Sequence, residues 1–356
     1  MIEKRVNEKQ MDHLRSSAES GGMEIVMKEN FALGVDLGWV TQLEHLGYSW
    51  IDDAGKTTDP IEACKNMGAN AVRFRIFVNP PQEAFWQKRE NETCMLGFCD
   101  TKSVVEAAKR VRDQGMDVML GFHYSDHFAD PEIQDIPEEW KDDGDEALTE
   151  RVYRHTKESL LLFQENGVEP RWVQVGNEIN HGIMWPKGRL EENPDALVRF
   201  LNAGYEAVKE VFPDCQVITH MAGVNSEEWC MPFLDNFFAK NGKTDIIGFS
   251  YYPYWMQFES DKDALLGWLT MYEQKFGKPV MIVEVGAEDE DEQGAYQTIR
   301  HCVDAVREMP EDRGLGVFYW EPEVHRSVVP DHYPLGAARI AADHTLQYTK
   351  ALTAYL

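Results

Sequence analysis

Two glutamates, each at the end of an apolar run, could together do acid–base chemistry. Glu178 follows Asn177 where the run Trp172–Val175 gives out, and Glu284 closes the run Val280–Glu284. A carboxylate is costly to bury in a strand without compensation, so both side chains fit the rim of a cleft. Paired carboxylates across a cleft are what glycoside hydrolysis needs, one protonated and one ionised. Either glutamate alone is also compatible with a structural ion pair.

Eight short apolar runs are predicted to be the strands that position these residues, with amphipathic helices between them. The predicted strands are Phe31–Asp36, Ala71–Val78, Asp117–Phe122, Trp172–Asn177, Gln216–His220, Ile246–Ser250, Val280–Glu284 and Gly316–Trp320. Strands that alternate with helices favour βαβ units and a parallel sheet. Eight such units in 356 residues predict a fold of the α/β class, a single (β/α)8 TIM barrel.

A doubly wound open sheet is the alternative fold. Its nucleotide-binding loop would follow the first strand, where Gly34-Val-Asp-Leu-Gly38 lacks the third glycine of that motif. Residues 1–28 are predicted to be an N-terminal tail or short helix, and residues 29–356 to be one catalytic barrel. A closing helix is predicted at Leu346–Leu356.

The C-terminal ends of barrel strands supply catalytic groups, and here nearly every end is polar or aromatic. In chain order the ends carry Asp36; Arg73 and Arg75; His123, Tyr124 and Asp126; Asn177 and Glu178; His220; Tyr251, Tyr252 and Trp255; Glu284; and Trp320 and Glu321. The fourth and seventh strands lie on opposite sides of a barrel mouth, so Glu178 and Glu284 are expected to face each other.

The surroundings of the two glutamates are expected to separate their pKa values. Arg73 or Arg75 near Glu284 would keep it anionic, and its charge would raise the pKa of Glu178. The arginines could instead pair with Asp36, and His123 and His220 could equally be hydrogen-bonded core residues.

Aromatic side chains offer flat apolar faces for sugar rings. Trp320, Trp255 and Tyr252 are the candidates for this role, whereas Trp86, Trp140 and Trp229 are interpreted as packing residues. The acidic run Glu288–Glu292 is interpreted as a solvated loop rather than a calcium site.

Composition limits the partners. The formal net charge is −27, from 62 acidic and 35 basic residues, which disfavours nucleic acid and anionic membrane surfaces but leaves neutral substrates unaffected. The sequence contains no apolar stretch of about 18 residues and no signal peptide, and its six cysteines are scattered. We therefore expect free thiols, a cytoplasmic location (or a secreted one if a leader had been removed), no membrane association, and no metal or other cofactor. The oligomeric state stays open.

The sequence also resembles a known family, the arabinogalactan endo-β-1,4-galactanases, which belong to a large clan of retaining (β/α)8 glycosidases. The resemblance runs from about Gly34 to about Glu323. The motifs that carry it are Asn70-Ala-Val-Arg-Phe-Arg-Ile-Phe-Val-Asn-Pro80, Phe122-His-Tyr-Ser-Asp126, Ala129-Asp-Pro131, Val173-Gln-Val-Gly-Asn-Glu-Ile179, Trp185-Pro-Lys-Gly188, Ser250-Tyr-Tyr-Pro-Tyr-Trp255 and Val317-Phe-Tyr-Trp-Glu-Pro322.

The resemblance implies a role for each site residue. Glu178 would be the acid/base and Glu284 the nucleophile of a double displacement with net retention. Residues around them would bind substrate or support the pair: Asn177 at the 2-hydroxyl, Arg73 under Glu284, Tyr252 in contact with Glu284, Trp320 beside the scissile bond, and His123 and His220 along the cleft.

The sequence departs from the family pattern at Glu284-Val-Gly286, where Glu-Thr-Ala is usual, at Phe77, where tryptophan is common, and at Gly121, where aspartate is frequent. The loop between strands seven and eight is short, so the calcium site that some members carry there is expected to be missing. These departures leave the chemistry intact and concern substrate length and location.

The sequence thus predicts an endo-β-1,4-galactanase that acts on neutral β-1,4-galactan or galactooligosaccharides. Two alternatives stay open: a mannanase, xylanase or glucanase of the same clan, and a non-catalytic sugar-binding barrel.

Overall fold

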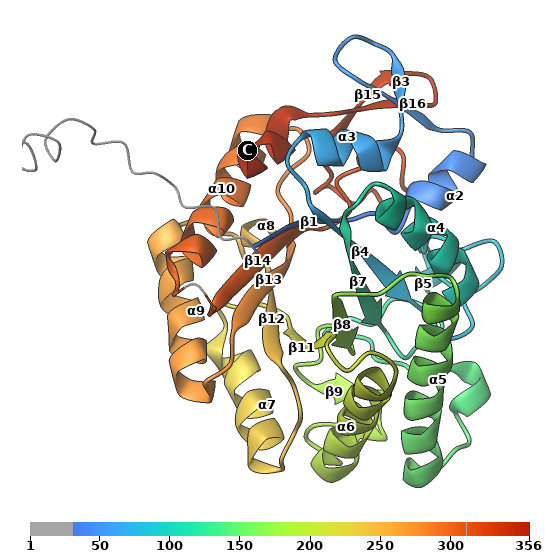
Figure 1. The fold of residues 1–356 in the computed structure, drawn as a ribbon, viewed down its shortest axis with the longest axis vertical. Helices are drawn as coiled ribbons and strands as arrows, with labels where there is room; N and C mark the ends of the chain where they lie inside the picture. Colours follow the sequence, from blue (N-terminus) through green and yellow to red (C-terminus); the bar gives the residue numbers. More distant parts are fainter. Residues whose placement is uncertain (1–30, 311) are drawn as a thin grey trace, which may run out of the picture. The chain divides into compact units, whose positions relative to one another are not determined.

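Eight parallel strands form a closed barrel in the computed structural model, which describes residues 31–310 and 312–356 (Figure 1). They are β1 (Ala32–Asp36), β4 (Ala71–Ile76), β7 (Asp117–Phe122), β8 (Trp172–Val175), β11 (Gln216–Met221), β12 (Ile246–Tyr251), β13 (Val280–Val285) and β14 (Gly314–Tyr319). Strand β1 pairs with both β4 and β14, which closes the ring. The predicted (β/α)8 barrel and all eight strands are confirmed, with ends that differ by at most two residues. The tail or helix predicted at residues 1–28 lies outside the described residues.

Helices lie between the strands and surround the barrel (Figure 1). The longer ones are α3 (Pro60–Asn66), α4 (Thr101–Asp113), α5 (Asp145–Glu165), α6 (Pro194–Val211), α7 (Glu227–Ala239), α9 (Lys262–Phe276) and α10 (Glu292–Glu308). Short segments are α2 (Val40–His45), α8 (Pro253–Met256) and the 3-10 turns η1 (Glu138–Trp140) and η2 (Lys350–Tyr355). Several starts follow from the sequence, because Asp59, Asp100 and Asp261 accept backbone N–H bonds at the first turn of α3, α4 and α9.

The barrel interior is filled by apolar side chains from every strand. This layer contains Ala32, Ala71, Met119, Trp172, Ile218, Ile246, Met281, Val283 and Phe318. Residue 34 has to be glycine, because a Cβ there would lie 2.1 Å from the ring of Phe318. A packed interior of this kind leaves the strand ends as the place for chemistry.

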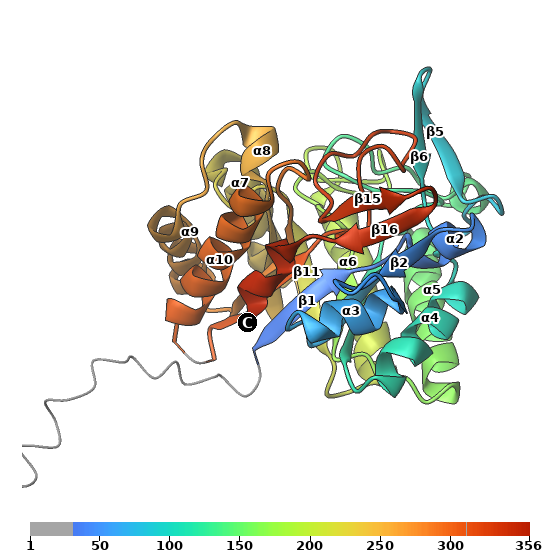
Figure 2. The same cartoon turned by 90° about the horizontal axis from the view of Figure 1, so that it is seen from above.

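Strands outside the barrel build three further features among the described residues. A four-stranded sheet has the order β15 (Ala338–Ala342), β16 (Thr345–Tyr348), β2 (Ser49–Ile51) and β3 (Thr57–Thr58). The hairpin of β5 (Phe85–Arg89) and β6 (Glu92–Met95) projects from the barrel, as Figure 2 shows. A small ribbon pairs β9 (Gly182–Ile183) with β10 (Gly188–Arg189).

The closing helix predicted at Leu346–Leu356 is wrong. This segment begins as β16, in which Leu346 and Tyr348 are buried and alternate with half-buried neighbours, and it ends as the 3-10 turn η2. Strand β16 pairs in parallel with β2, and that tertiary pairing overrides the local helical spacing. The Tyr355 hydroxyl then donates to the Gly34 carbonyl at 2.7 Å.

Within residues 31–310 and 312–356, the helices are all too short or too polar to span a bilayer. The six cysteines are free, and each of them is buried.

Candidate active site

A cleft of about 700 Å³ opens at the C-terminal ends of the barrel strands. Six of the predicted site residues line it, namely His123, Asn177, Glu178, Tyr252, Glu284 and Trp320. The other two, Arg73 and His220, are 1% and 0% exposed and contact the lining residues from beneath. The structure therefore brings all eight predicted residues together, six at the surface of the cleft and two behind it.

Glu178 is held at a sharp turn that follows β8. The strand ends at Val175, Gly176 has φ +82°, and Glu178 itself has φ +49°. Non-glycine residues seldom adopt a positive φ, and those that do are concentrated at functional sites. The turn places Oε1 of Glu178 2.6 Å from the Ser250 hydroxyl at the end of β12.

Glu284 lies in β13, and its two oxygens each have a donor. Nη1 of Arg73 donates to Oε1 at 2.7 Å, and the Tyr252 hydroxyl donates to Oε2 at 3.0 Å. Both donors bind the ionised carboxylate better than the neutral acid, so they favour the anion.

The two carboxyls are close neighbours, with one oxygen of each within 4.8 Å of the other. An oxygen–oxygen distance within 4.8 Å is compatible with the roughly 5–5.5 Å carboxyl separation of retaining glycosidases, and it leaves little room for the water that inverting enzymes hold between carboxyls roughly 6.5–9.5 Å apart. Burial and the charge of Glu284 raise the pKa of Glu178 to about 8. Burial also raises the pKa of Glu284, but Arg73 and Tyr252 oppose that effect, so Glu284 ionises first. Between the two pKa values the pair is one acid, Glu178, and one anion, Glu284.

Arg73 joins Glu284 to two other groups. Its Nη1 lies 3.0 Å from Oδ2 of Asp36, and its Nη2 donates to Oδ1 of Asn177 at 2.8 Å. The two arrangements that the sequence left open, pairing with Glu284 or with Asp36, thus occur together. Arg75 does not reach Glu284; it lies 3.4 Å from Oδ1 of Asp36 and forms an ion pair with Glu321.

Three buried carboxyls, Asp36, Glu321 and Glu323, form a cluster beneath the cleft. The backbone N–H of Trp39 points at two of them, 3.1 Å from Glu321 Oε2 and 3.2 Å from Glu323 Oε1. Burial raises the pKa of Glu321 to about 8 and that of Glu323 to about 7. Since both side chains are 0% exposed, the cluster supports the floor of the site rather than touching substrate.

The two histidines are neutral and have defined partners. The backbone N–H of Ala129 donates to Nδ1 of His123 at 3.0 Å, so the ring proton lies on Nε2. His220 lies between Oδ1 of Asn177, at 3.0 Å, and Oγ of Ser250, at 2.8 Å. Burial lowers the pKa of both rings well below the usual value, and the charge of Arg73 adds to this effect.

Aromatic rings form the walls of the cleft. Trp320 packs edge-on against Tyr333 and Trp39, with ring centroids 4.6 and 5.1 Å apart. Trp255 is 51% exposed at another part of the lining, which leaves its face open to a ligand.

The three tryptophans interpreted as packing residues differ. Trp140 is buried, as predicted. Trp229 is 40% exposed and lines the cleft, so that prediction is wrong for it; α7 begins just before it and directs it outward. Trp86 stacks on His127 at 3.9 Å between centroids and also lines the cleft, because the β5–β6 hairpin carries it there.

The acidic run Glu288–Glu292 is only partly the solvated loop that was predicted. Asp289 is 8% exposed and forms an ion pair with Arg326 at 2.5 Å, while Asp291 caps α10. The ion pair with Arg326 offsets the cost of burying Asp289.

The groups in the cleft are poorly suited to binding a metal ion. In the part of the chain that the structure describes, Glu178, His220 and Glu284 offer ligand atoms within 4.8 Å of one another. Both ring nitrogens of His220 already have hydrogen-bond partners, so the histidine has no lone pair directed at the cleft.

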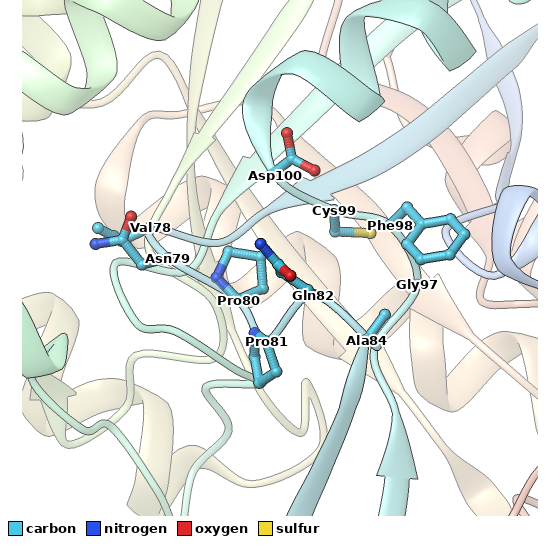
Figure 3. A pocket seen from close by; sticks show the side chains of 10 residues that line it. All are labelled: Val78, Asn79, Pro80, Pro81, Gln82, Ala84, Gly97, Phe98, Cys99 and Asp100. Atoms are coloured by element: carbon cyan, nitrogen blue, oxygen red, sulfur yellow. The ribbon is translucent and has the colours of Figure 1, made fainter.

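A second, smaller pocket of about 330 Å³ lies between residues 78–84 and 97–100 (Figure 3). Its one carboxylate, Asp100, accepts from the backbone N–H groups of Lys102 and Ser103 and from the Ser103 hydroxyl. These bonds cap α4, so the pocket lacks the reactive pair that marks the larger cleft.

Sequence reasoning missed several residues of the site. Ser250 was named only as a strand end and the start of a family motif, and Glu323 only as the end of the family resemblance. Tyr333 comes from the loop after β14. The serine, which opens a motif of the sixth strand end, could have been found by the rule that placed His220; the loop residue carried no periodic signal.

Known proteins resemble this chain over most of its length. The profile of glycosyl hydrolase family 53 matches residues 32–355. An endo-β-1,4-galactanase of Bacillus subtilis (strain 168) is 31% identical over 318 residues, which cover 83% of this chain and 71% of that protein. An arabinogalactan endo-β-1,4-galactanase of Cellvibrio japonicus is 30% identical over 323 residues, covering 82% of this chain and 80% of the relative.

A solved structure agrees with the fold. The catalytic domain of an Ignisphaera aggregans protein of the same family superposes with a TM-score of 0.80 at 26% identity. The match covers 94% of this chain and 97% of that domain.

Proposed function

The chain belongs to glycosyl hydrolase family 53, and from that premise we propose that it is a retaining endo-β-1,4-galactanase in which Glu178 is the acid/base and Glu284 the nucleophile. The substrate is a neutral polysaccharide, β-1,4-galactan or its oligosaccharides. The observation that carries the assignment of roles is the carboxyl pair, two glutamates within 4.8 Å whose surroundings separate their pKa values.

In the first step, Glu178 gives its proton to the glycosidic oxygen while a carboxylate oxygen of Glu284 attacks the anomeric carbon. The glycosidic bond breaks, the shortened chain leaves as an alcohol, and a galactosyl ester of Glu284 forms. In the second step, ionised Glu178 takes a proton from water, and the hydroxide oxygen attacks the anomeric carbon. Glu284 is released as the carboxylate, and the two inversions give net retention.

The neighbouring side chains act on these steps through the contacts described above. Arg73 and Tyr252 keep Glu284 ionised and aimed at the cleft. Asn177 accepts at Oδ1 from Arg73, and one hydrogen of its Nδ2 goes to the Ala129 carbonyl at 2.9 Å. Its second hydrogen is directed to a substrate hydroxyl. His123 lines the cleft beside it, and Trp320 supplies a face for a sugar ring next to the scissile bond.

The test is hydrolysis of linear β-1,4-galactan, with new reducing ends counted and products separated by chromatography. Glu178→Gln and Glu284→Gln are each expected to reduce turnover at least about a thousandfold, because a carboxamide neither donates a proton in this way nor attacks carbon. Glu165→Gln, at an exposed end of α5, is the matched control and should leave turnover unchanged. Near-normal turnover in either active-site variant would contradict the assignment of roles.

Two further measurements separate the alternatives. Proton NMR during the first minutes of hydrolysis should show the β-anomer as the initial product, whereas the α-anomer would mean inversion. Parallel assays on mannan, xylan and β-glucan should give much slower release of reducing ends than galactan; faster hydrolysis of any of them would overturn the substrate assignment.

A further inference from the structure

We propose that Ser250 and His220 are positioning residues that hold the proton on Glu178 through a hydrogen-bond chain with a single direction. The chain runs from Glu178 through Ser250 and His220 to Asn177. The proposal deepens the proposed function, on which it rests, since it concerns the acid/base residue of that reaction.

The direction of the chain is set at Asn177. Its Nδ2 lies 2.9 Å from the Ala129 carbonyl, which can only accept, and its Oδ1 lies 2.8 Å from Nη2 of Arg73, which can only donate. Oδ1 also accepts from Nε2 of Gln174 at 2.8 Å. The amide therefore has one orientation, with its oxygen toward His220.

The orientation of Asn177 fixes the tautomer of His220. Nδ1 lies 3.0 Å from Oδ1 of Asn177, an acceptor, so Nδ1 must carry the ring proton. The ring is 0% exposed, and Arg73 and His123 are the charged or titratable groups that bear on it. A second proton on this buried ring beside a guanidinium is strongly disfavoured, so Nε2 is an acceptor.

Because Nε2 of His220 is an acceptor, the hydroxyl of Ser250 must be its donor. Its hydroxyl has one hydrogen, and that hydrogen goes to Nε2 of His220 at 2.8 Å. Across the 2.6 Å between Oγ and Oε1, Ser250 donates to an ionised Glu178; with its hydrogen on His220, the same oxygen instead accepts from a protonated Glu178. The arrangement that satisfies every buried group is the one in which Glu178 carries the proton.

When Glu178 loses its proton, the direction of its hydrogen bond with Ser250 reverses. An ionised Glu178 needs a donor, so the Ser250 hydrogen rotates away from His220 and Nε2 is left buried without a partner. The carboxylates of Glu284 and Asp130 also raise the pKa of Glu178, whereas a Ser250 hydroxyl that donates to Glu178 lowers it, as does the guanidinium of Arg73. The chain thus favours the return of the proton, which is the resetting step that a residue alternating between acid and base requires.

Replacing His220 with asparagine or with glutamine tests the contributions of the two ring nitrogens separately. His220→Asn keeps a donor near the position of Nδ1 and removes the acceptor at Nε2, whereas His220→Gln can present its amide oxygen near Nε2. We expect His220→Asn to move the basic limb of the kcat/KM profile on galactan down by about one pH unit, the equivalent of about 1.4 kcal/mol. The acidic limb, which reports Glu284, should stay in place, and His220→Gln should restore the basic limb.

Ser250→Ala tests the other link. Glu178 loses its partner, so proton donation to a poor leaving group should slow roughly tenfold or more, while a nitrophenyl leaving group that needs no proton should leave at nearly the wild-type rate. Aryl glycosides of β-1,4-galactobiose provide both leaving groups. Ser159→Ala, at a buried serine of α5 bonded to Thr101, is the control for loss of a buried hydroxyl.

A direct titration of Glu178, which requires no enzyme turnover, also tests the proposal. The carboxyl band that disappears in Glu178→Gln identifies this residue in pH-difference infrared spectra, and its midpoint should fall in His220→Asn. Unchanged midpoints in His220→Asn, with a Ser250→Ala loss equal for both leaving groups, would overturn the proposal. A wild-type protein that leaves galactan intact would overturn the proposed function, and the infrared midpoints would still decide the role of the chain.

Discussion

Replacing Arg73 with methionine should destabilise the fold in a pH-dependent way. The change keeps a long unbranched side chain but removes the guanidinium that contacts Glu284 at 2.7 Å and Asp36 at 3.0 Å. Glu284 would then be a buried carboxyl without its cation. Because a buried charge without a partner is very costly, the folded variant takes up a proton at this carboxyl instead.

The free energy needed to protonate Glu284 sets the size of the expected loss of stability. Protonating a carboxyl whose ordinary pKa is 4.5 costs about 1.36 kcal/mol for each pH unit above that value. The loss of stability from this group is therefore up to about 3.4 kcal/mol at pH 7 and about 0.7 kcal/mol at pH 5, and the first figure lies in the usual range for breaking a buried ion pair. The sign follows from linkage: the variant raises the folded pKa of Glu284 further above its unfolded value, so stability is lost as the pH rises.

Urea unfolding followed by tryptophan fluorescence at pH 5 and pH 7 measures both figures. Arg154→Met, at a surface pair with Glu150, is the control and should lose less than about 1 kcal/mol, equally at both pH values. Galactan hydrolysis at pH 7 should fall at least about a hundredfold, since a protonated Glu284 is not a nucleophile. An equal loss of stability at pH 5 and pH 7, or a loss below 1 kcal/mol at pH 7, would refute the reasoning.

Three further predictions follow from contacts around the site. Tyr252→Phe removes a 3.0 Å bond to ionised Glu284, so the acidic limb of the kcat/KM profile should move to higher pH; an unmoved limb would mean that the bond is not made in solution. Burial raises the pKa of Glu323 to about 7, so this residue makes the fold less stable as the pH rises from about 4.5, and Glu323→Gln should flatten the fall of Tm between pH 5 and pH 8. Gly97→Ala would place a Cβ 2.1 Å from a backbone oxygen at φ +78° and should cost more than about 3 kcal/mol by thermal unfolding, whereas Gly115→Ala, at φ +71° with nothing within 4 Å, should cost about 1 kcal/mol.

The barrel and its two glutamates could be predicted because each leaves a local signal. A strand buried on both faces of a parallel sheet is a short continuous apolar run, and β7, for example, has its predicted bounds. A carboxylate at the end of such a run is costly to leave unpaired, and the occurrence of two of them, on the fourth and seventh predicted strands, distinguished Glu178 and Glu284. The family motifs then added the expected substrate and the separate roles of the two residues.

Pairings between distant residues could not be predicted. Ser250 meets Glu178 across 72 positions of the chain, and the choice between Glu284 and Asp36 as partner of Arg73 had no local signature because the side chain reaches both. The helix predicted at the C-terminus failed for the same reason, since the partner of β16 is β2 near the other end of the barrel domain.

The hairpin β5–β6 is an insertion that the barrel pattern does not contain. Its strands are half-buried, so their apolar and polar residues do not alternate in the manner of a core strand. It nevertheless carries Trp86 to the cleft, and Lys88 joins it to Asp130 after β7 at 2.8 Å.

The closure of the barrel between β1 and β14 has a consequence for the order of events during synthesis. Arg75 forms an ion pair with Glu321, and the N–H of Trp39 lies 3.1 Å from that same carboxylate, 282 positions further along the chain. A nascent chain that has not yet released β14 from the ribosome therefore has an open sheet, with the edges of β1 and β13 unpaired. Unpaired strand edges promote aggregation, and the barrel, with the floor of the site around Glu321, closes only after β14 has emerged.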